Sequence, residues 1–213
     1  MEFLDPKLDQ YAEEHTSPES KVLAELNRET WAKVLMPRML SGHIQGRTLA
    51  MFSQMKSPRY ILEIGTYTGY SGICLAEGLQ KGGELHTIDI NEELEDMVTT
   101  YIEKAGMSDR IITHIGNALE IIPTLDRKWD MVFIDADKEN YSNYFDLVID
   151  RMAPGGILIA DNVLWSGKVL DDPKKVDEET RSLQKFNEKI QKDDRVENVL
   201  LPIRDGLMVI RVK

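Results

Sequence analysis

Short apolar runs, each followed by an acidic residue or a glycine, recur along the chain from residue 59 onward. They alternate with stretches in which apolar residues return at helical spacing, such as residues 92–105. Apolar runs of this kind are typical of strands buried on both faces, and their alternation with helices predicts right-handed βαβ units around a parallel sheet. The predicted strands are residues 60–64, 85–88, 111–115, 131–134 and 157–160.

The N-terminal part of the chain has a different pattern. Apolar residues at helical spacing predict helices at residues 4–15, 18–34 and 46–55. Residues 37–43 interrupt this pattern with a proline and a glycine, so we expect a flexible segment there, close to a site.

The C-terminal part predicts an antiparallel addition to the sheet. A polar stretch runs from residue 161 to about residue 177 and is followed by a helix to about residue 191. Two strands, 196–201 and 207–212, then form a hairpin, which places an antiparallel strand in an otherwise parallel sheet. We therefore predict a doubly wound α/β fold.

Length and composition favour one soluble unit. A chain of 213 residues with 42% hydrophobic residues has the size and composition of one α/β domain. We expect residues 1–57 to supply N-terminal helices and a lid segment, and residues 58–213 to form the α/β core. The formal net charge of −11 argues against a broad basic surface for nucleic acid.

The cellular compartment is predicted from the apolar runs and the cysteine content of the sequence. No apolar run approaches the roughly 20 residues of a membrane span, and residues 1–11 lack the apolar core of a secretory signal. Cys74 is the only cysteine, so it forms no internal disulfide and no zinc cluster. We expect a cytoplasmic protein.

The turn after the first strand is a candidate cofactor site. Ligands of doubly wound sheets bind beyond the carboxyl ends of the strands, where glycines such as Gly65 and Gly69 allow close approach. Glu63 beside this turn would repel phosphate and would suit a cationic ligand such as an amino group or a sulfonium. The alternative is an ordinary tight turn.

The ends of the second and third strands extend this candidate site. Asp89 ends the second strand, where a carboxylate commonly accepts hydrogen bonds from ribose hydroxyls, which indicates an adenosine-containing cofactor. Its alternative role is a helix N-cap, although Asn91 can fill that role itself. Asn117 and Ala118 follow the third strand, where an adenine ring would pack.

Acidic side chains follow the fourth and fifth predicted strands. Asp135, Asp161 and Asn162 come directly after strands whose carboxyl ends share one edge of the sheet, so we expect them to converge. Two carboxylates and an amide oxygen are hard ligands that suit Mg²⁺, whereas zinc and iron prefer nitrogen or sulfur. Each carboxylate taken alone is more often a cap or a loop residue.

Lys138 is the candidate general base. It lies three residues beyond Asp135, and a nearby divalent cation would disfavour its charged form. The alternative is a solvated surface lysine. The four histidines have no metal-like spacing, and only His43 is of functional interest, because it lies in the segment 37–43.

Four motifs together resemble the cation-dependent, S-adenosylmethionine-dependent O-methyltransferases typified by catechol and caffeoyl-CoA O-methyltransferases. They are EIGTYTGYS at residues 63–71, FIDADK at 133–138, DNVLWSG at 161–167 and LPIRDG at 201–206. The resemblance implies a Rossmann-like class I methyltransferase fold. Its sheet would have seven mostly parallel strands with one antiparallel strand, helices on both faces and extra N-terminal helices.

The resemblance also implies a role for each matching residue. Those matching cofactor positions are Ser41, Glu63 and Ser71 at the methionine part, Gly65 and Thr66 in the turn beneath it, Asp89 at the ribose, Ala118 at the adenine, and Asp135. Asp135, Asp161 and Asn162 match ligands of Mg²⁺ or of another divalent cation such as Mn²⁺ or Ca²⁺. Lys138 matches the proposed base and is also expected to contact the substrate. Trp165 resembles an aromatic wall of the acceptor pocket, and Met39 and Arg204 are further candidates for substrate contact. A homodimer is implied as well.

The sequence departs from the family at two positions that bear on the choice of acceptor substrate. Ser166 stands where the plant enzymes usually carry asparagine, and Arg204 replaces a small residue, which weakens the case for a coenzyme A ester. We therefore predict a small catechol-type phenol, with a carboxylate that Arg204 or another basic residue could pair with. The alternatives are methylation of a tRNA hydroxyuridine, methylation of a caffeoyl-CoA-type ester, and a non-enzymatic adenosine-binding module. The first would need a local basic patch, for which the N-terminal candidates are Lys21, Arg28, Lys33, Arg38 and Arg47.

Overall fold

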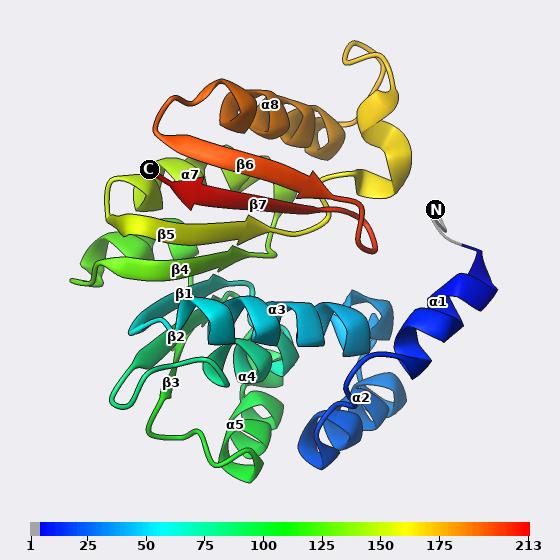
Figure 1. Cartoon of the computed structure of the whole chain (residues 1–213), viewed down its shortest axis with the longest axis vertical. Helices are drawn as coiled ribbons and strands as arrows, with labels where there is room; N and C mark the ends of the chain where they lie inside the picture. Colours follow the sequence, from blue (N-terminus) through cyan, green and yellow to red (C-terminus); the bar gives the residue numbers. More distant parts are fainter. Residues whose placement is uncertain (1–4) are drawn as a thin grey trace.

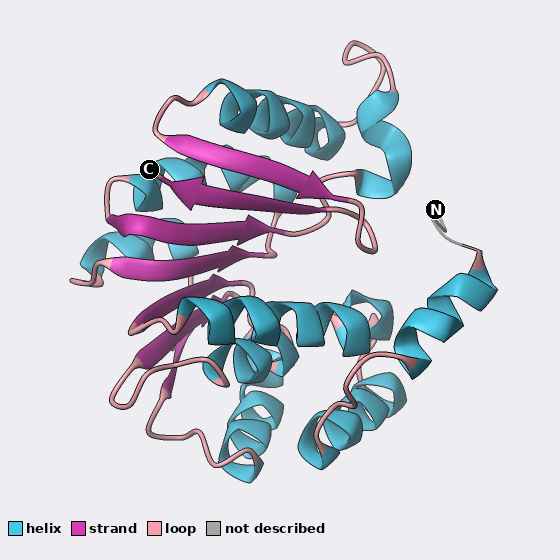
Figure 2. Cartoon of the chain, in the orientation of Figure 1, coloured by secondary structure: helices cyan, strands magenta, loops and turns pink. Residues whose placement is uncertain are grey.

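The predicted strands all belong to one seven-stranded sheet in the computed structural model, which describes residues 5–213. The strand order is β3-β2-β1-β4-β5-β7-β6, and β7 runs antiparallel to both of its neighbours. The strands are β1 Tyr60–Ile64, β2 Glu84–Asp89, β3 Ile111–Ile115, β4 Trp129–Ile134, β5 Met152–Ala160, β6 Val196–Leu201 and β7 Leu207–Val212. This mixed sheet confirms the predicted class I methyltransferase fold (Figures 1 and 2).

The strand order places a site between β1 and β4. From β1 the chain adds β2 and β3 on one side, then returns to add β4 and β5 on the other. At such a reversal the connections leave the sheet in opposite directions and open a crevice beyond the carboxyl ends of the strands. Ile64 pairs with Ile134 at the ends of β1 and β4, so the residues that follow both strands meet at this crevice.

Helices cover both faces of the sheet, as the alternating orientation of strand side chains requires. Leu62 and Val132 point to the face on which α7 and α8 pack, while Ile61 and Phe133 point to the face covered by α2 to α5. The α-helices are α1 Pro6–Glu14, α2 Lys21–Lys33, α3 Gly42–Lys56, α4 Tyr70–Ala76, α5 Glu95–Lys104, α6 Ala118–Ile121, α7 Tyr141–Ile149 and α8 Glu178–Lys192.

The N-terminal segment is more ordered in its backbone than the sequence indicated. A 3-10 helix spans Pro37–Met39, where the fixed φ of proline suits a first turn. The following helix starts at Gly42, four residues before the predicted start at residue 46. The irregular part of 37–43 is therefore short. The predicted helix 4–15 corresponds to α1, and Leu4 itself lies outside the described residues.

The polar stretch after β5 also contains a short element. Residues Trp165–Leu170 form a 3-10 segment whose course is interrupted at Ser166 and Gly167, where φ is positive. This segment turns the chain back across the end of the sheet before α8. Within residues 5–213 the structure contains no helix of sufficient length and hydropathy to span a bilayer.

Candidate active site

A cavity of about 2180 Å³ opens beyond the carboxyl ends of the strands. Its size exceeds the roughly 300–1,000 Å³ of common small-molecule sites, so it can hold two ligands side by side. Most of the sequence-predicted site residues line it, namely Met39, Ser41, Gly65, Asp89, Ala118, Asp135, Lys138, Asp161, Asn162, Trp165 and Arg204. Glu63, Thr66 and Ser71 do not line it and are buried beside it.

Gly65 is required by the packing of two strand ends. Its φ is +102°, and a Cβ built on it would lie 1.9 Å from the carbonyl oxygen of Asp135. No other residue type fits this position without displacing the backbone. The glycine that the sequence suggested for close ligand approach therefore also lets the β1 turn touch the end of β4, which brings the cofactor turn next to the acidic residues.

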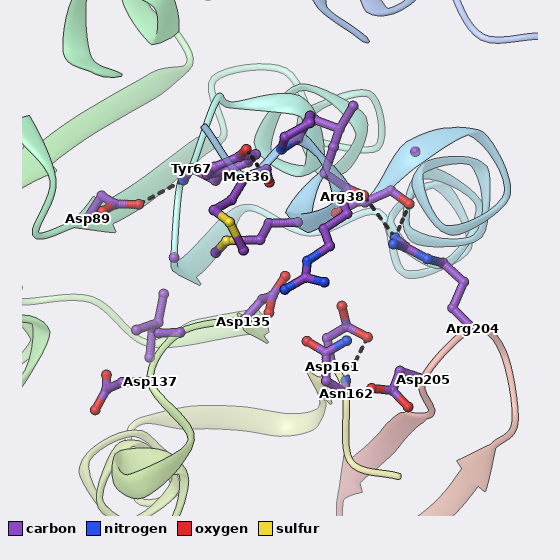
Figure 3. A pocket seen from close by; sticks show the side chains of 18 of the residues that line it. Met36, Arg38, Tyr67, Asp89, Asp135, Asp137, Asp161, Asn162, Arg204 and Asp205 are labelled. Atoms are coloured by element: carbon purple, nitrogen blue, oxygen red, sulfur yellow. Dashed lines mark hydrogen bonds between the residues drawn. The ribbon is translucent and has the colours of Figure 1, made fainter. Parts of the chain in front are cut away.

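Asp89 supports the same turn from the neighbouring strand. Its carboxylate accepts hydrogen bonds from the backbone amides of Thr66 at 3.0 Å and Tyr67 at 2.7 Å, and from that of Asn91 at 2.9 Å. Asn91 itself caps the following 3-10 helix, as expected. A carboxylate has about four acceptor positions, so Asp89 retains about one for a ligand hydroxyl. It lies at the cavity wall beside Tyr67 (Figure 3).

Glu63 lies beneath the turn and is fully buried. Its Oε2 accepts a hydrogen bond from Thr87 Oγ1 at 2.6 Å and lies 2.7 Å from the position that a Cβ on Gly72 would take. Its Oε1 has no hydrogen-bond partner within residues 5–213. Burial raises the pKa of Glu63 to about 7, although hydrogen bonds from Ser71 and Thr87 oppose the shift. Glu63 is thus a buried acid poised between its charged and neutral forms.

The two aspartates that follow β4 and β5 meet at one end of the cavity (Figure 3). Asp161 is only 2% exposed, and burial together with the repulsion from Asp135 raises its pKa to about 7. Asn162 follows with φ +59°, a left-handed turn that asparagine tolerates better than most residues. The convergence predicted from the strand ends is therefore observed.

These residues fit a hard divalent cation. A cation placed between the two carboxylates would relieve the repulsion that disfavours their charged forms. No group of three His, Cys, Asp or Glu side chains in the described part of the chain is arranged to hold a metal. In the predicted ligand set, the amide oxygen of Asn162 would be the third oxygen ligand beside the two aspartates.

Lys138 is a buried lysine, not a solvated one. It is 6% exposed and donates hydrogen bonds to the hydroxyl of Tyr141 at 2.6 Å and to Oδ1 of Asp135 at 3.1 Å. The Tyr141 hydroxyl donates in turn to the backbone carbonyl of Asp161 at 3.0 Å. The Trp165 ring lies 5.8 Å from Lys138 Nζ. These contacts hold the amine at the same end of the cavity as the aspartates.

Arg204 lines the cavity, as predicted for a substrate residue, and also contacts the N-terminal segment. Its Nη1 donates to the backbone carbonyls of Leu40, at 3.1 Å, and Ser41, and to Oε1 of Gln45 at 2.9 Å. Arg204 therefore joins the β6–β7 turn to the N-terminal segment. Arg38 points from that segment into the cavity and makes no ion pair within residues 5–213 (Figure 3).

Two side chains at the site were not predicted from the sequence. Gln45 donates to Oδ2 of Asp161 at 2.7 Å, and Tyr141 orients Lys138. Tyr141 lies three residues after Lys138, one helical turn away, a spacing that could have indicated the pair. His43, the exception among the histidines, contacts the backbone carbonyl of Ser17 at 2.7 Å and also lines the cavity.

The structure combines a Rossmann-like fold with a cavity that is lined by Asp89, an acidic pair and a buried lysine. Comparison with known proteins agrees. The model of a family described as O-methyltransferase matches residues 13–213. The chain is 35% identical over 195 residues to caffeoyl-CoA O-methyltransferase 5 of Nicotiana tabacum, an alignment that covers 86% of this chain and 81% of the relative. It is 33% identical over 204 residues to caffeoyl-CoA O-methyltransferase of Medicago sativa, covering 91% and 82%.

Solved structures show the same relationship. An O-methyltransferase from Bacillus cereus in complex with SAH superposes with a TM-score of 0.90 at 32% identity, covering 97% of each chain. TomG from Streptomyces achromogenes, an O-methyltransferase of tomaymycin synthesis solved with SAM, has a TM-score of 0.90 at 28% identity and covers 97% and 96%. The chain belongs to the O-methyltransferase family and is an S-adenosylmethionine (SAM)-dependent O-methyltransferase.

Proposed function

We propose that this enzyme transfers the methyl group of SAM to a hydroxyl of a small catechol-type phenol with the help of a divalent cation, Mg²⁺ first among them. The observation that carries the proposal is the buried Lys138 amine, held beside Asp135 and next to Asp161 at the floor of the cavity. A lysine and two acids in one water-poor place form a site for removing a proton from an acidic hydroxyl.

In this proposal residues at the carboxyl ends of β1, β2 and β3 would hold SAM. Asp89 offers its remaining acceptor position to the ribose, Ala118 packs on the adenine, and Ser41 holds the methionine end over the Gly65–Thr66 turn. Glu63 and Ser71, buried beside the cavity, supply negative potential and a hydroxyl beneath the cationic part of the cofactor. Asp135 contacts the cofactor as well as the cation.

Asp135, Asp161 and Asn162 would hold the cation, which supplies positive charge that favours the phenolate form of the acceptor. Lys138 accepts the phenolic proton at Nζ. The phenolate oxygen attacks the methyl carbon in line, so the new O–C bond forms while the S–C bond of SAM breaks. The side chains of Met39 and Trp165 wall the acceptor, and positioning of donor and acceptor supplies a large share of the rate.

Two arginines that line the cavity, Arg204 and Arg38, could pair with a carboxylate on the acceptor. Neither arginine has an ion-pair partner within residues 5–213, but Arg204 Nη1 donates to the N-terminal segment, whereas the Arg38 side chain makes no hydrogen bond there and enters the cavity. We therefore assign the pairing with an acceptor carboxylate to Arg38. A caffeoyl-CoA-type ester is the second candidate acceptor, since the relatives from Nicotiana tabacum and Medicago sativa, at 35% and 33% identity, are named for that substrate.

The test is a methylation screen with labelled SAM across catechol, protocatechuate, caffeoyl-CoA and total tRNA, with Mg²⁺ or with EDTA. We expect label in the free catechols and loss of that label in EDTA. Activity on a catechol that survives EDTA unchanged contradicts the cation-dependent mechanism. Preference for caffeoyl-CoA moves the enzyme to the second candidate.

Two variants separate the proposed roles. Lys138→Ala should lower kcat about 10²–10⁴-fold, the usual contribution of a general base, with SAH affinity kept. Asp161→Ala should abolish the cation-dependent turnover. Lys168→Ala is the matched control, because Lys168 also lies 5.8 Å from the Trp165 ring and lines the cavity but is half exposed. Full activity of Lys138→Ala would assign the proton transfer to another group.

A further inference from the structure

Gln45 is a fully buried polar side chain whose two ends have opposite partners. From α3, its Nε2 donates to Oδ2 of Asp161 at 2.7 Å, and its Oε1 accepts from Arg204 Nη1 at 2.9 Å. Gln45 thus connects Asp161, which lies 116 positions after it in the sequence, with Arg204, which lies 159 positions after it. Arg204 approaches from the β6–β7 turn towards the N-terminal segment (Figure 3).

The chemistry of the neighbours sets the direction of the amide. Arginine has donors only and an ionised carboxylate has acceptors only, so the oxygen of Gln45 faces Arg204 and its NH₂ group faces Asp161. Rotating the amide by 180° would break both hydrogen bonds. It would place the amide oxygen against the Asp161 carboxylate and the NH₂ group against the Arg204 guanidinium. Arg204 therefore fixes the donor that Asp161 receives.

The two aspartates receive side-chain hydrogen bonds from different donors. Lys138 donates to Asp135, whereas Gln45 is the one side chain that donates to the Asp161 carboxylate within the described residues. The other hydrogen bond to Asp161 comes from the backbone amide of Asn162, at 2.7 Å on Oδ1. A neutral amide orients a carboxylate and leaves its negative charge available, whereas a lysine or an arginine in this place would compete with a bound cation.

We propose that Gln45 is the positioning residue of Asp161, and that Arg204 sets the orientation of Gln45. This inference rests on the proposed function, in which Asp161 holds the cation. Because Arg204 also holds the carbonyls of Leu40 and Ser41, the same side chain ties the N-terminal segment, with its cofactor residue Ser41, to the cation ligand. Groups that orient metal ligands typically change metal affinity about 10–100-fold when removed.

The experiment measures two affinities on each variant, that for Mn²⁺ in the presence of SAH, by electron paramagnetic resonance, and that for SAH, by calorimetry. Gln45→Met keeps the length of the side chain and removes both polar ends. We expect it to weaken Mn²⁺ binding about 10–100-fold while SAH affinity stays within about twofold. Arg204→Met should weaken SAH binding as well, and its effect on Mn²⁺ should be smaller than that of Gln45→Met. Gln54→Met, on the exposed side of the same helix, is the control and should change neither affinity.

Each of the following results tests the proposed role of Gln45. Unchanged Mn²⁺ affinity in Gln45→Met overturns the proposal while leaving the proposed function intact. A parallel fall of Mn²⁺ affinity, SAH affinity and melting temperature shows a merely structural role and also overturns it. If the wild-type protein binds no Mn²⁺, the cation site of the proposed function is wrong and the role of Gln45 falls with it. Should Gln45→Met fail to fold, Gln45→Asn keeps the polarity but is one methylene too short to reach both partners, and the same loss of Mn²⁺ affinity is expected.

Discussion

Two acidic residues of this protein, Glu63 and Asp161, are buried, unlike the many acidic residues on its surface. Most of the 37 Asp and Glu side chains are solvated, whereas Glu63 and Asp161 are removed from water next to the cavity. Burial raises the pKa of each to about 7, so both can change charge near neutral pH. Asp161 meets the cation in the proposed mechanism, and Glu63 lies beneath the cofactor, where a positive ligand would favour its charged form.

Glu63 makes the stability of the ligand-free protein depend on pH. Its folded-state pKa of about 7 lies above the ordinary value of 4.5, so the folded state holds a proton that the unfolded chain has already released. The contribution of Glu63 to the free energy of unfolding is fully present below about pH 4.5. It is lost as the pH rises to about 7, and the loss amounts to about 3 kcal/mol. In EDTA, the difference in unfolding free energy between wild type and Glu63→Gln should fall by about this amount from pH 4.5 to pH 7.5 in urea titrations.

The control for this measurement is Glu103→Gln on the exposed side of α5, which has similar surroundings in the folded and unfolded states. Its difference from wild type should stay flat with pH. A flat difference for Glu63→Gln as well would show that Glu63 is already ionised in the folded protein.

At the scale of elements, the segment between α2 and α3 closes one side of the cavity with few ties. It exposes apolar side chains, with Leu35 at 93% and Met39 at 56%. Its backbone is held by the Tyr67 hydroxyl, which donates to the carbonyl of Met36 at 2.8 Å, and by Arg204 at Leu40 and Ser41. Segments with few buried contacts open more readily than the core, so if this segment is the predicted lid, these hydrogen bonds would limit its opening.

Tyr67→Phe removes one of these ties. A single hydrogen bond contributes about 1 kcal/mol, so amide exchange across residues 35–40 should speed up about fivefold while global stability changes little. Hydrogen exchange read by mass spectrometry measures this directly. Tyr60→Phe is the matched control, because the Tyr60 hydroxyl makes no hydrogen bond in the described part of the chain. Unchanged exchange in Tyr67→Phe would mean that Arg204 alone holds the segment.

At the scale of the whole molecule, charge separates the candidate substrates. The net charge is −11, and the N-terminal basic residues that a tRNA would need are partly neutralised. Lys33 pairs with Glu29 at 2.6 Å, and Arg47 pairs with Glu77 at 2.6 Å. The structure therefore weakens the tRNA alternative further. A homodimer, the folding of residues 1–57 and 58–213 as one unit, and a cytoplasmic location stay predictions.

We expect no saturable binding of total tRNA at about 0.15 M salt below about 10 µM protein in a fluorescence assay. The negative field of the chain repels a polyanion, and the remaining basic residues are too few to offset it. Binding that weakens steeply with salt, and weakens again in Arg28→Glu on the exposed side of α2, would instead support a nucleic-acid substrate.

Local pattern was enough to predict most of the fold and part of the site. Apolar runs closed by Gly65, Asp89, Gly116, Asp135 and Asp161 located five strands and placed the chemistry at their carboxyl ends. Because parallel strands share one such edge, the convergence of Asp135 and Asp161 could be predicted from sequence positions alone. The motifs added the family, which the comparisons confirmed.

Tertiary structure alone decided the contacts between distant segments. The hydrogen bonds from Gln45 to Asp161 and from Arg204 to Gln45 join residues more than 100 positions apart, and no periodicity records such a pairing. For the same reason the sequence could not show that Arg204 holds the N-terminal segment, or that Glu63 lies behind the cavity wall. Burial and hydrogen-bond partners depend on how elements pack, so the sequence determined which chemistry is present at the sheet edge, and the packing decided which side chain faces which.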